Sequence, residues 1–409
     1  MGRPVATATL EIRLRPGGGR IEAGEEPGTE MGQDHLATMI RDSVRAHGAR
    51  TAMRWKAGGA WRSLTYAELG ERIRAVARAL LESGVGEGDR VGVFARNSPE
   101  WAIADLAILS VRAVAVPIYA TNTARQARYV VEDAGLRLVF AGDQDQLDKI
   151  MSFRAAAPRL RQVVVLDPAA RPSGEGCLRF DELLRLGAAS TRDAELDARL
   201  AAAAPDDVAS LIYTSGTTGE PKGAVLAHAG FFHQFRAIDD RFTVGPSDRS
   251  LCFLPLSHAY ERTWSYYVFR QGAVNHYLAD PRDVVAALPD VRPTVMVSVP
   301  RLYEKICAAV VERAARSSPP RRALFRWAMR VVAGTGTGAA RAGESARSSR
   351  SSTGSPTRSS CSGSARWSEG RRTSSRAAAP RCPGRSRSSS SPRASSCARA
   401  TASPRPRPC

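Results

Sequence analysis

The chain has 409 residues, a formal net charge of +19 and 43% hydrophobic residues. This length allows two or three domains with a substantial buried core. A charge of +19 spread over the whole chain would suggest binding to nucleic acid or to a membrane. However, residues 341–409 hold 15 arginines and two glutamates, so +13 of the net charge lies there. The remaining 340 residues have the charge of an ordinary globular protein.

The seven cysteines show neither metal-ligand spacing nor the paired framework of a secreted protein. The most apolar run, residues 101–120, is interrupted by Asp105 and Arg112, which argues against a membrane span. The first residues lack the apolar region of a signal peptide. We therefore expect a cytoplasmic location, with peripheral membrane association left open.

Three regions follow from composition. Residues 1–30 are rich in Gly, Pro and Glu without sustained periodicity, and we predict that they are disordered. Residues 31–335 carry the hydrophobic patterns of a folded domain. Residues 336–409 form an Arg-, Ser- and Pro-rich tail that cannot bury enough apolar surface to fold.

Short apolar strands alternate with longer amphipathic helices in the folded region, which predicts an α/β fold with a largely parallel sheet covered on both faces. Gly58 and Gly59 predict a hairpin turn between the first two strands. Thr65, Ser98 and Thr123 are predicted helix caps. Predicted strands are residues 52–55, 60–64, 91–95, 113–118, 138–141, 162–166, 208–213, 224–226, 250–254 and 294–299. Predicted helices are residues 36–46, 65–84, 98–111, 191–204, 231–238 and 301–313, together with a helix that begins at residue 123.

The tail has an unusual alphabet. Apart from Glu344 and Glu369, residues 341–409 use only Ala, Arg, Gly, Ser, Thr, Pro, Cys and Trp. These eight residues share G or C at the middle codon base, as a GC-rich gene would give after a shift of one base. We infer a frameshift after about residues 332–341, which resequencing of the DNA there would test. The alternative is a genuine Arg/Ser-rich segment that binds RNA.

The most informative stretch is residues 213–223, which places five hydroxyl groups, three glycines and one lysine between two predicted strands. Its glycines allow the backbone to curl close to a ligand, and a curled run of free N–H groups binds anions. Lys222 adds a mobile positive charge that suits a polyphosphate. The spacing differs from that of the nucleoside-triphosphatase loop, G-x-x-x-x-G-K-[ST]. An ordinary polar turn is the alternative.

Residues 213–223 resemble the phosphate-binding loop of the adenylate-forming (AMP-binding) enzymes, which include acyl-CoA synthetases, peptide-synthetase adenylation domains and luciferases. Residues 254–262 (LPLSHAYER) and 299–305 (VPRLYEK) resemble the long-chain fatty acid–CoA ligase branch of that superfamily. The resemblance covers roughly residues 36–332. It implies an incomplete N-terminal domain of layered βα sheets, followed by the disordered tail.

The resemblance implies ATP-dependent activation of a fatty acid to an acyl-adenylate and then to acyl-CoA, with ATP, Mg²⁺ and CoA as cofactors or substrates. His258 would lie near the α-phosphate and the acyl carboxylate. Tyr260 and Trp264 are candidates for the acyl site, with core packing as the alternative, and Glu261 and Arg262 are candidates for a structural ion pair. The phosphate-binding residues would be Thr214, Ser215, Gly216, Thr217, Thr218, Gly219 and Lys222.

Later family motifs for Mg²⁺, adenine and ribose, the hinge and the C-terminal catalytic lysine are absent from the sequence, so no metal ligand is assigned. We therefore predict an inactive fragment of a ligase family. Rival hypotheses are an adenylate-forming enzyme for another carboxylic acid and an RNA-binding protein that uses its tail. No specific nucleic-acid partner is expected under the main hypothesis.

Overall fold

The computed structural model describes residues 34–214 and 220–331. The predicted disordered residues 1–30 and the tail from 336 lie outside these ranges. The chain divides into two compact units, Met1–Phe325 and Arg326–Cys409. Every helix and strand named below belongs to the first unit.

The first unit contains a seven-stranded sheet in the order β7-β6-β5-β3-β4-β8-β9. Its strands run parallel to one another except β9, which pairs antiparallel with β8. This confirms the predicted α/β fold. The strands are β3 (Arg90–Ala95), β4 (Val114–Tyr119), β5 (Leu138–Ala141), β6 (Gln162–Val165), β7 (Cys177–Arg179), β8 (Val208–Thr214) and β9 (Lys222–Ala227).

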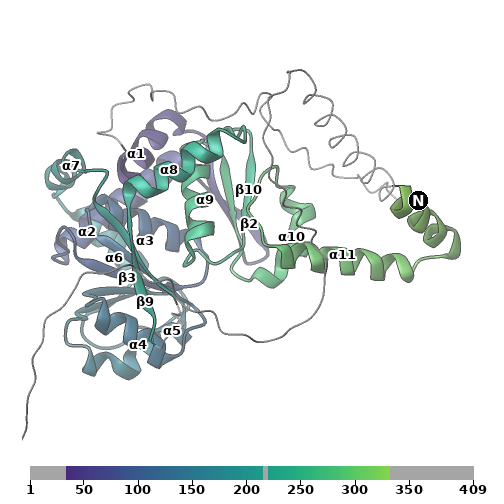
Figure 1. The fold of residues 1–409 in the computed structure, drawn as a ribbon. Helices are drawn as coiled ribbons and strands as arrows, with labels where there is room; N and C mark the ends of the chain where they lie inside the picture. Colours follow the sequence, from purple (N-terminus) through teal and green to yellow (C-terminus); the bar gives the residue numbers. More distant parts are fainter. Residues whose placement is uncertain (1–33, 215–219, 332–409) are drawn as a thin grey trace, which may run out of the picture. The chain divides into compact units, whose positions relative to one another are not determined.

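Helices cover both faces of this sheet (Figure 1). On one face, α4 (Ala124–Asp133) and α5 (Gln144–Phe153) pack over β3 to β6 in one hydrophobic cluster. The other face belongs to a larger cluster that also reaches the second sheet. Its helices include α1 (Leu36–His47), α2 (Tyr66–Glu82), α3 (Pro99–Ser110), α6 (Phe180–Ala189), α7 (Asp193–Ala201), α8 (His228–Asp239) and α9 (Ala259–Arg270).

The second sheet has four strands in the order β10-β11-β1-β2. Gly58 and Gly59 both have positive φ and form the predicted hairpin turn between β1 and β2. The predicted strand at 294–299 is wrong, because only Val295 pairs there, through one isolated bridge to Ser250. The elements are β1 (Thr51–Ala57), β2 (Ala60–Thr65), β10 (Arg249–Cys252), β11 (Val274–Tyr277), α10 (Val284–Val291) and α11 (Pro300–Ala315), with short 3₁₀ turns at Arg154–Ala156 and Pro281–Asp283.

Local signals fix the helix starts. Thr65 and Thr123 form complete capping boxes, in which each hydroxyl accepts a backbone N–H and the residue three positions later bonds back. Ser98 caps α3, with Pro99 in the first turn. Within the described ranges, none of the helices combines the length and apolar character needed to cross a bilayer.

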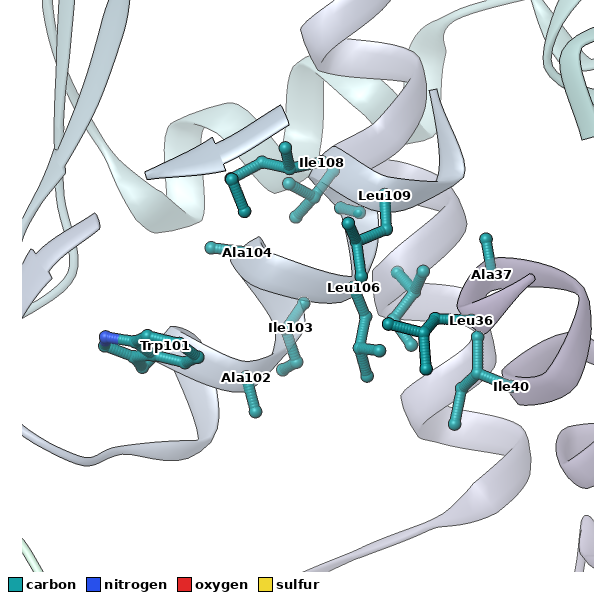
Figure 2. Close-up of a cluster of buried hydrophobic side chains, with 14 of the residues drawn as sticks. Leu36, Ala37, Ile40, Trp101, Ala102, Ile103, Ala104, Leu106, Ile108 and Leu109 are labelled. Atoms are coloured by element: carbon teal, nitrogen blue, oxygen red, sulfur yellow. The ribbon is translucent and has the colours of Figure 1, made fainter. Parts of the chain in front are cut away.

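Helix α3 is buried along its whole length. Figure 2 shows its apolar side chains beside those of α1, with Leu106 near Leu36. Asp105 interrupts this apolar helix and is fully buried. Its carboxylate accepts two hydrogen bonds from the Arg262 guanidinium and one from the Tyr266 hydroxyl (2.5 Å). Arg262 also donates to the Ser210 hydroxyl (2.6 Å), so the network joins α3, α9 and β8.

Helix α6 crosses α2 with no space for a side chain at the crossing. A Cβ atom at Gly187 would lie 1.7 Å from the backbone oxygen of Ala75. The Arg78 guanidinium donates to the Gly187 carbonyl oxygen (2.8 Å) and so bonds the two helices at this crossing. Only glycine therefore permits this approach.

Two buried histidines stack against each other between α1 and α8. The rings of His35 and His228 have centroids 3.6 Å apart, and both side chains are almost completely buried. The Leu36 N–H donates to His228 Nδ1 (3.1 Å), and the Ala37 N–H donates to His35 Nδ1 (3.2 Å). Burial lowers the pKa of His35 to about 4, against the opposing effect of the Asp207 carboxylate, and burial also places the pKa of His228 well below its usual value.

Replacing Asp105 with alanine should lower the free energy of unfolding by about 3–5 kcal/mol, because the Arg262 charge is then buried without a counter-ion. Urea unfolding followed by circular dichroism measures this loss. The matched control is Glu132→Ala, which removes the exposed partner of Arg128 and should cost less than about 1 kcal/mol. Equal losses in the two variants would contradict a dominant role for the buried pair.

Lowering the pH from about 6.5 to about 4 should destabilise the fold, because the unfolded chain binds protons at His35 and His228 that the folded chain excludes. The stability is fully present above the unfolded pKa. The change in the urea midpoint from pH 5 to pH 7 should be less positive in the double variant His35→Asn, His228→Gln than in the parent, because the variant loses the histidine contribution. The exposed His233→Gln variant should keep the parental dependence, and an unchanged slope in the double variant would refute the assignment.

Candidate functional site

The predicted phosphate-binding loop connects two paired strands. Thr214 ends β8 and Lys222 begins β9, and they are Cα partners in the antiparallel ladder. Both side chains are exposed. The hairpin was predicted from the two apolar runs that flank the loop. Five predicted phosphate-binding residues lie outside the described residues: Ser215, Gly216, Thr217, Thr218 and Gly219.

Helix α4 holds the two ends of this loop. The Tyr129 hydroxyl donates to the Pro221 carbonyl oxygen (3.1 Å), and the Arg125 guanidinium lies 3.7 Å from the Glu220 carboxylate. On the other side of the loop, the Tyr213 hydroxyl donates to Asp133 Oδ2 (2.5 Å). Burial and this carboxylate raise the pKa of Tyr213, so the phenol stays protonated as a donor. The loop therefore starts and ends on fixed residues.

His258 is the N-cap residue of α9 and its side chain is exposed. It is the last residue of a turn formed by residues 254–258, which we call the 254–258 turn. Its N–H donates to the Pro255 carbonyl oxygen (2.9 Å). His258 Nδ1 accepts a hydrogen bond from the Tyr260 N–H (3.2 Å). In the neutral ring the proton then resides on Nε2, which leaves that atom as a donor for an anionic ligand.

The two predicted acyl-site aromatics differ in their surroundings. The Tyr260 side chain is 49% exposed in the first turn of α9. Trp264 is 8% exposed, its Nε1 donates to the Ser250 hydroxyl (2.9 Å), and its ring packs against Tyr267. The position of Trp264 therefore agrees with the core-packing alternative, while Tyr260 is open to a ligand. Both acyl-site assignments stay predictions.

Strand register places the hairpin at one edge of the large sheet. Ala95 pairs with Tyr119 at the carboxyl ends of β3 and β4. Ala115 pairs with Ser210, and four residues further along both parallel strands this register brings Thr214 level with Tyr119. Neighbouring strands lie about 4.8 Å apart, so Ala95 and Thr214 are about 10 Å from each other. Ligands of such sheets bind beyond the carboxyl ends of the strands.

Asn97 brings the 254–258 turn to the same edge. It lies two residues beyond β3, and its side-chain amide donates to the Leu254 carbonyl oxygen (2.7 Å) and accepts from the Leu256 N–H (2.9 Å). The structure thus brings Thr214, Lys222 and the turn that carries His258 to one sheet edge. Sequence analysis missed Asn97, although a polar residue just after a predicted parallel strand is a usable signal.

Glu261 and Arg262 do not bond to each other, so the predicted ion pair between them is wrong. Adjacent residues on a helix point about 100° apart, and each side chain has its own partner. Arg262 pairs with Asp105, whereas Glu261 Oε2 accepts from the Leu254 N–H (3.1 Å). Burial raises the pKa of Glu261 to about 8, opposed by this backbone N–H and by the Cys252 thiol.

No group of three His, Cys, Asp or Glu side chains in residues 34–214 and 220–331 could hold a metal ion. A shallow hollow of about 340 Å³ does occur at the opposite, amino-terminal edge of β3, β4 and β8. Val114, Val208 and Leu211 supply part of its lining. It lies away from the hairpin loop, so we do not include it in the candidate site.

A model of the AMP-binding enzyme family matches residues 40–363. The chain belongs to this family. It is 36% identical over 297 residues to long-chain-fatty-acid–CoA ligase FadD15 of Mycobacterium bovis, a match that covers 72% of this chain and 48% of the relative. It is 33% identical to the peroxisomal long chain acyl-CoA synthetase 7 of Arabidopsis thaliana, covering 65% of this chain and 38% of that one.

A solved structure supports the fold assignment. ATP-bound MatB from Rhodopseudomonas palustris superimposes with a TM-score of 0.54 at 26% identity, covering 67% of this chain and 50% of that chain. This chain spans about half the length of the curated relatives it matches.

Raising the pH from about 4.5 to about 8 should destabilise the fold through Glu261, because the unfolded chain releases this proton at a lower pH than the folded chain does. The Glu261 contribution is fully present below about pH 4.5. We expect Glu261→Gln to reduce the fall of the urea midpoint between about pH 7 and pH 8, a range in which the His35 and His228 contributions no longer change. Glu304→Gln, at an exposed acid on α11, is the control; a parental decline in Glu261→Gln would contradict a protonated Glu261.

Proposed function

We propose that this chain carries the ATP- and acid-binding part of a long-chain fatty acid–CoA ligase. One observation supports the proposal: the strands that flank the predicted loop end at Thr214 and Lys222, at the same carboxyl end of the large sheet as Asn97, which bonds to the turn that carries His258. Membership of the AMP-binding family supports it. Similarity to a long-chain-fatty-acid–CoA ligase and to a long chain acyl-CoA synthetase supports a long-chain fatty acid as the substrate.

In the proposed reaction, a fatty acid carboxylate oxygen attacks the α-phosphorus of ATP. The new carboxyl–phosphate bond forms as the bond to pyrophosphate breaks, so pyrophosphate leaves with both electrons of that bond. The CoA thiol then attacks the acyl carbon, loses its proton, and releases AMP with the bridging oxygen. Both steps gather negative charge on phosphate oxygens, and preorganised donors at those oxygens stabilise it.

The residues of this chain would share the work as follows. Lys222 would place its ammonium against the β- and γ-phosphates as a point charge. His258 Nε2 would donate to an oxygen at the α-phosphate or the acyl carboxylate, because Nδ1 is already bonded to the backbone of α9. Tyr260 would stand beside the acyl chain. The remaining phosphate contacts would come from Thr214, Ser215, Gly216, Thr217, Thr218 and Gly219.

Mg²⁺ and CoA complete this chemistry. Bound Mg²⁺ would neutralise phosphate charge during the transfer. The described residues do not supply a carboxylate cluster for the ion, so no ligand in this chain and no step through the metal is assigned. Within residues 34–214 and 220–331 we likewise assign no residue to adenine, ribose or a catalytic lysine. We therefore propose that this chain binds nucleotide without completing the synthesis.

Replacing Lys222 with methionine should weaken binding of a fluorescent ATP analogue about 10- to 100-fold, because a hydrogen bond to a charged group contributes about 1.5–3 kcal/mol. Titration of the purified 409-residue chain measures this change. Lys56→Met, on the other sheet, is the matched control and should bind as the parent does. An unchanged affinity in Lys222→Met, or no binding by the parent, would refute the proposed nucleotide site.

A thioester assay tests the second part of the proposal. The purified chain, given palmitate, ATP, Mg²⁺ and CoA, should yield no palmitoyl-CoA detectable by mass spectrometry. ATP- and CoA-dependent formation of the thioester would show that the chain is a complete enzyme. Formation of a thioester from a short-chain or aromatic acid alone would instead favour another acid as the substrate.

A further inference from the structure

The 254–258 turn is held by a side chain from a different sheet. Asn97 is 7% exposed and follows β3 of the large sheet, whereas the turn follows β10 of the small sheet. The Asn97 amide nitrogen donates to the Leu254 carbonyl oxygen (2.7 Å), and its oxygen accepts from the Leu256 N–H (2.9 Å). A single amide thus satisfies one acceptor and one donor of the turn. This requires a group with both functions at once.

A second buried side chain, from the helix that follows the turn, also bonds to the Leu254 backbone. Glu261 is fully buried in the first turn of α9, and its Oε2 accepts from the Leu254 N–H (3.1 Å). Leu254 therefore has both of its backbone polar groups bonded to side chains, one to Asn97 and one to Glu261. The carboxyl group of Glu261 also lies beside the Cys252 thiol, and its burial favours the uncharged form of the acid.

A short, hydrogen-bonded piece of backbone connects Leu254 to His258. The His258 N–H bonds to the Pro255 carbonyl oxygen (2.9 Å), and the His258 carbonyl oxygen accepts from the Arg262 N–H (3.3 Å). His258 Nδ1 also caps α9. The backbone of His258 is thus fixed on both sides, and its ring stands exposed where the turn ends. A shift of the turn at Leu254 would move that ring.

We propose that Asn97 and Glu261 are positioning residues that together set where the His258 imidazole stands at the carboxyl edge of the large sheet. The catalytic meaning of that position rests on the proposed function. We call the bonds from Asn97 and Glu261 to the backbone of Leu254 and Leu256 the clamp. The clamp is a property of this chain and can be tested without measuring turnover.

The two residues predict different tolerance to near-isosteric substitution. Asn97→Asp keeps an acceptor for Leu256 but loses the donor to Leu254, and it sets a carboxylate against the Leu254 carbonyl oxygen. Glu261→Gln keeps an acceptor oxygen for the Leu254 N–H and stays neutral. We therefore expect Asn97→Asp and Glu261→Ala to release the turn, and Glu261→Gln to retain it. A purely space-filling role would not predict release of the turn by Asn97→Asp, because aspartate fills the same volume as asparagine.

Nuclear magnetic resonance of the 409-residue chain with ¹³C-labelled histidine rings tests the clamp. The chain has six histidines, and His258→Gln identifies the His258 signal. Asn97→Asp and Glu261→Ala should move this signal, whereas Glu261→Gln should leave it as in the parent. The exposed His233 signal is the internal control, and Glu304→Gln is the control for charge.

Parental His258 signals in both Asn97→Asp and Glu261→Ala, accompanied by lower urea midpoints, would overturn the proposal and leave a structural role only. If Asn97→Asp does not fold, Asn97→Ser supplies the same test, because its shorter hydroxyl cannot reach both Leu254 and Leu256. Hydrogen–deuterium exchange over residues 254–258 should then be at least about tenfold faster than in the parent. Unchanged exchange would also overturn it.

The outcome separates this inference from the proposed function. A His258 signal that moves as expected, in a chain that binds no ATP analogue, would uphold the clamp and refute the nucleotide site. If the parent chain binds the ATP analogue but the His258 signal is unchanged in Asn97→Asp and Glu261→Ala, the nucleotide site is upheld and the clamp is refuted.

Discussion

The ion pair between Asp105 and Arg262 is the interaction on which the arrangement of the molecule depends. A carboxylate in the middle of an apolar helix would be costly to bury alone, and only a charged partner with further hydrogen bonds offsets that cost. Arg262 meets this need and also bonds to Ser210, while its guanidinium lies over the Trp101 ring at 5.7 Å from the centroid. The buried core helix, the helix capped by His258 and the strand that leads into the hairpin loop are therefore fixed to one another at a single point.

Local signals made much of the fold predictable. The capping residues Thr65, Ser98 and Thr123 start helices as expected, and two glycines turn the first hairpin. Short apolar runs predicted the strands of the large sheet except β7, because strands covered on both faces have no polar side. Such signals act over a few residues and need no knowledge of distant parts of the chain.

What the sequence did not reveal depends on contacts between distant residues. Asp105 was read as an interruption of an apolar run, since its partner lies 157 positions away. Arg262 and Glu261 were paired with each other for the same reason, although each bonds elsewhere. Helix α9 was not predicted, because most of its own side chains, including most of its aromatic ones, are buried. It therefore lacks the usual amphipathic period. The strand expected at 294–299 failed because one bridge to β10 is all the pairing it has.

The approach of α6 to α2 shows how unevenly this fold tolerates change. At Gly187 even one methyl group would overlap the backbone of the neighbouring helix, while Leu186 and Ala188 on either side face solvent. Random mutagenesis across this helix should accordingly recover many replacements at both neighbours and none between them. Tolerance of substitution would therefore be broad at residues 186 and 188 and absent at 187. The cause is the lack of room for one Cβ atom at Gly187.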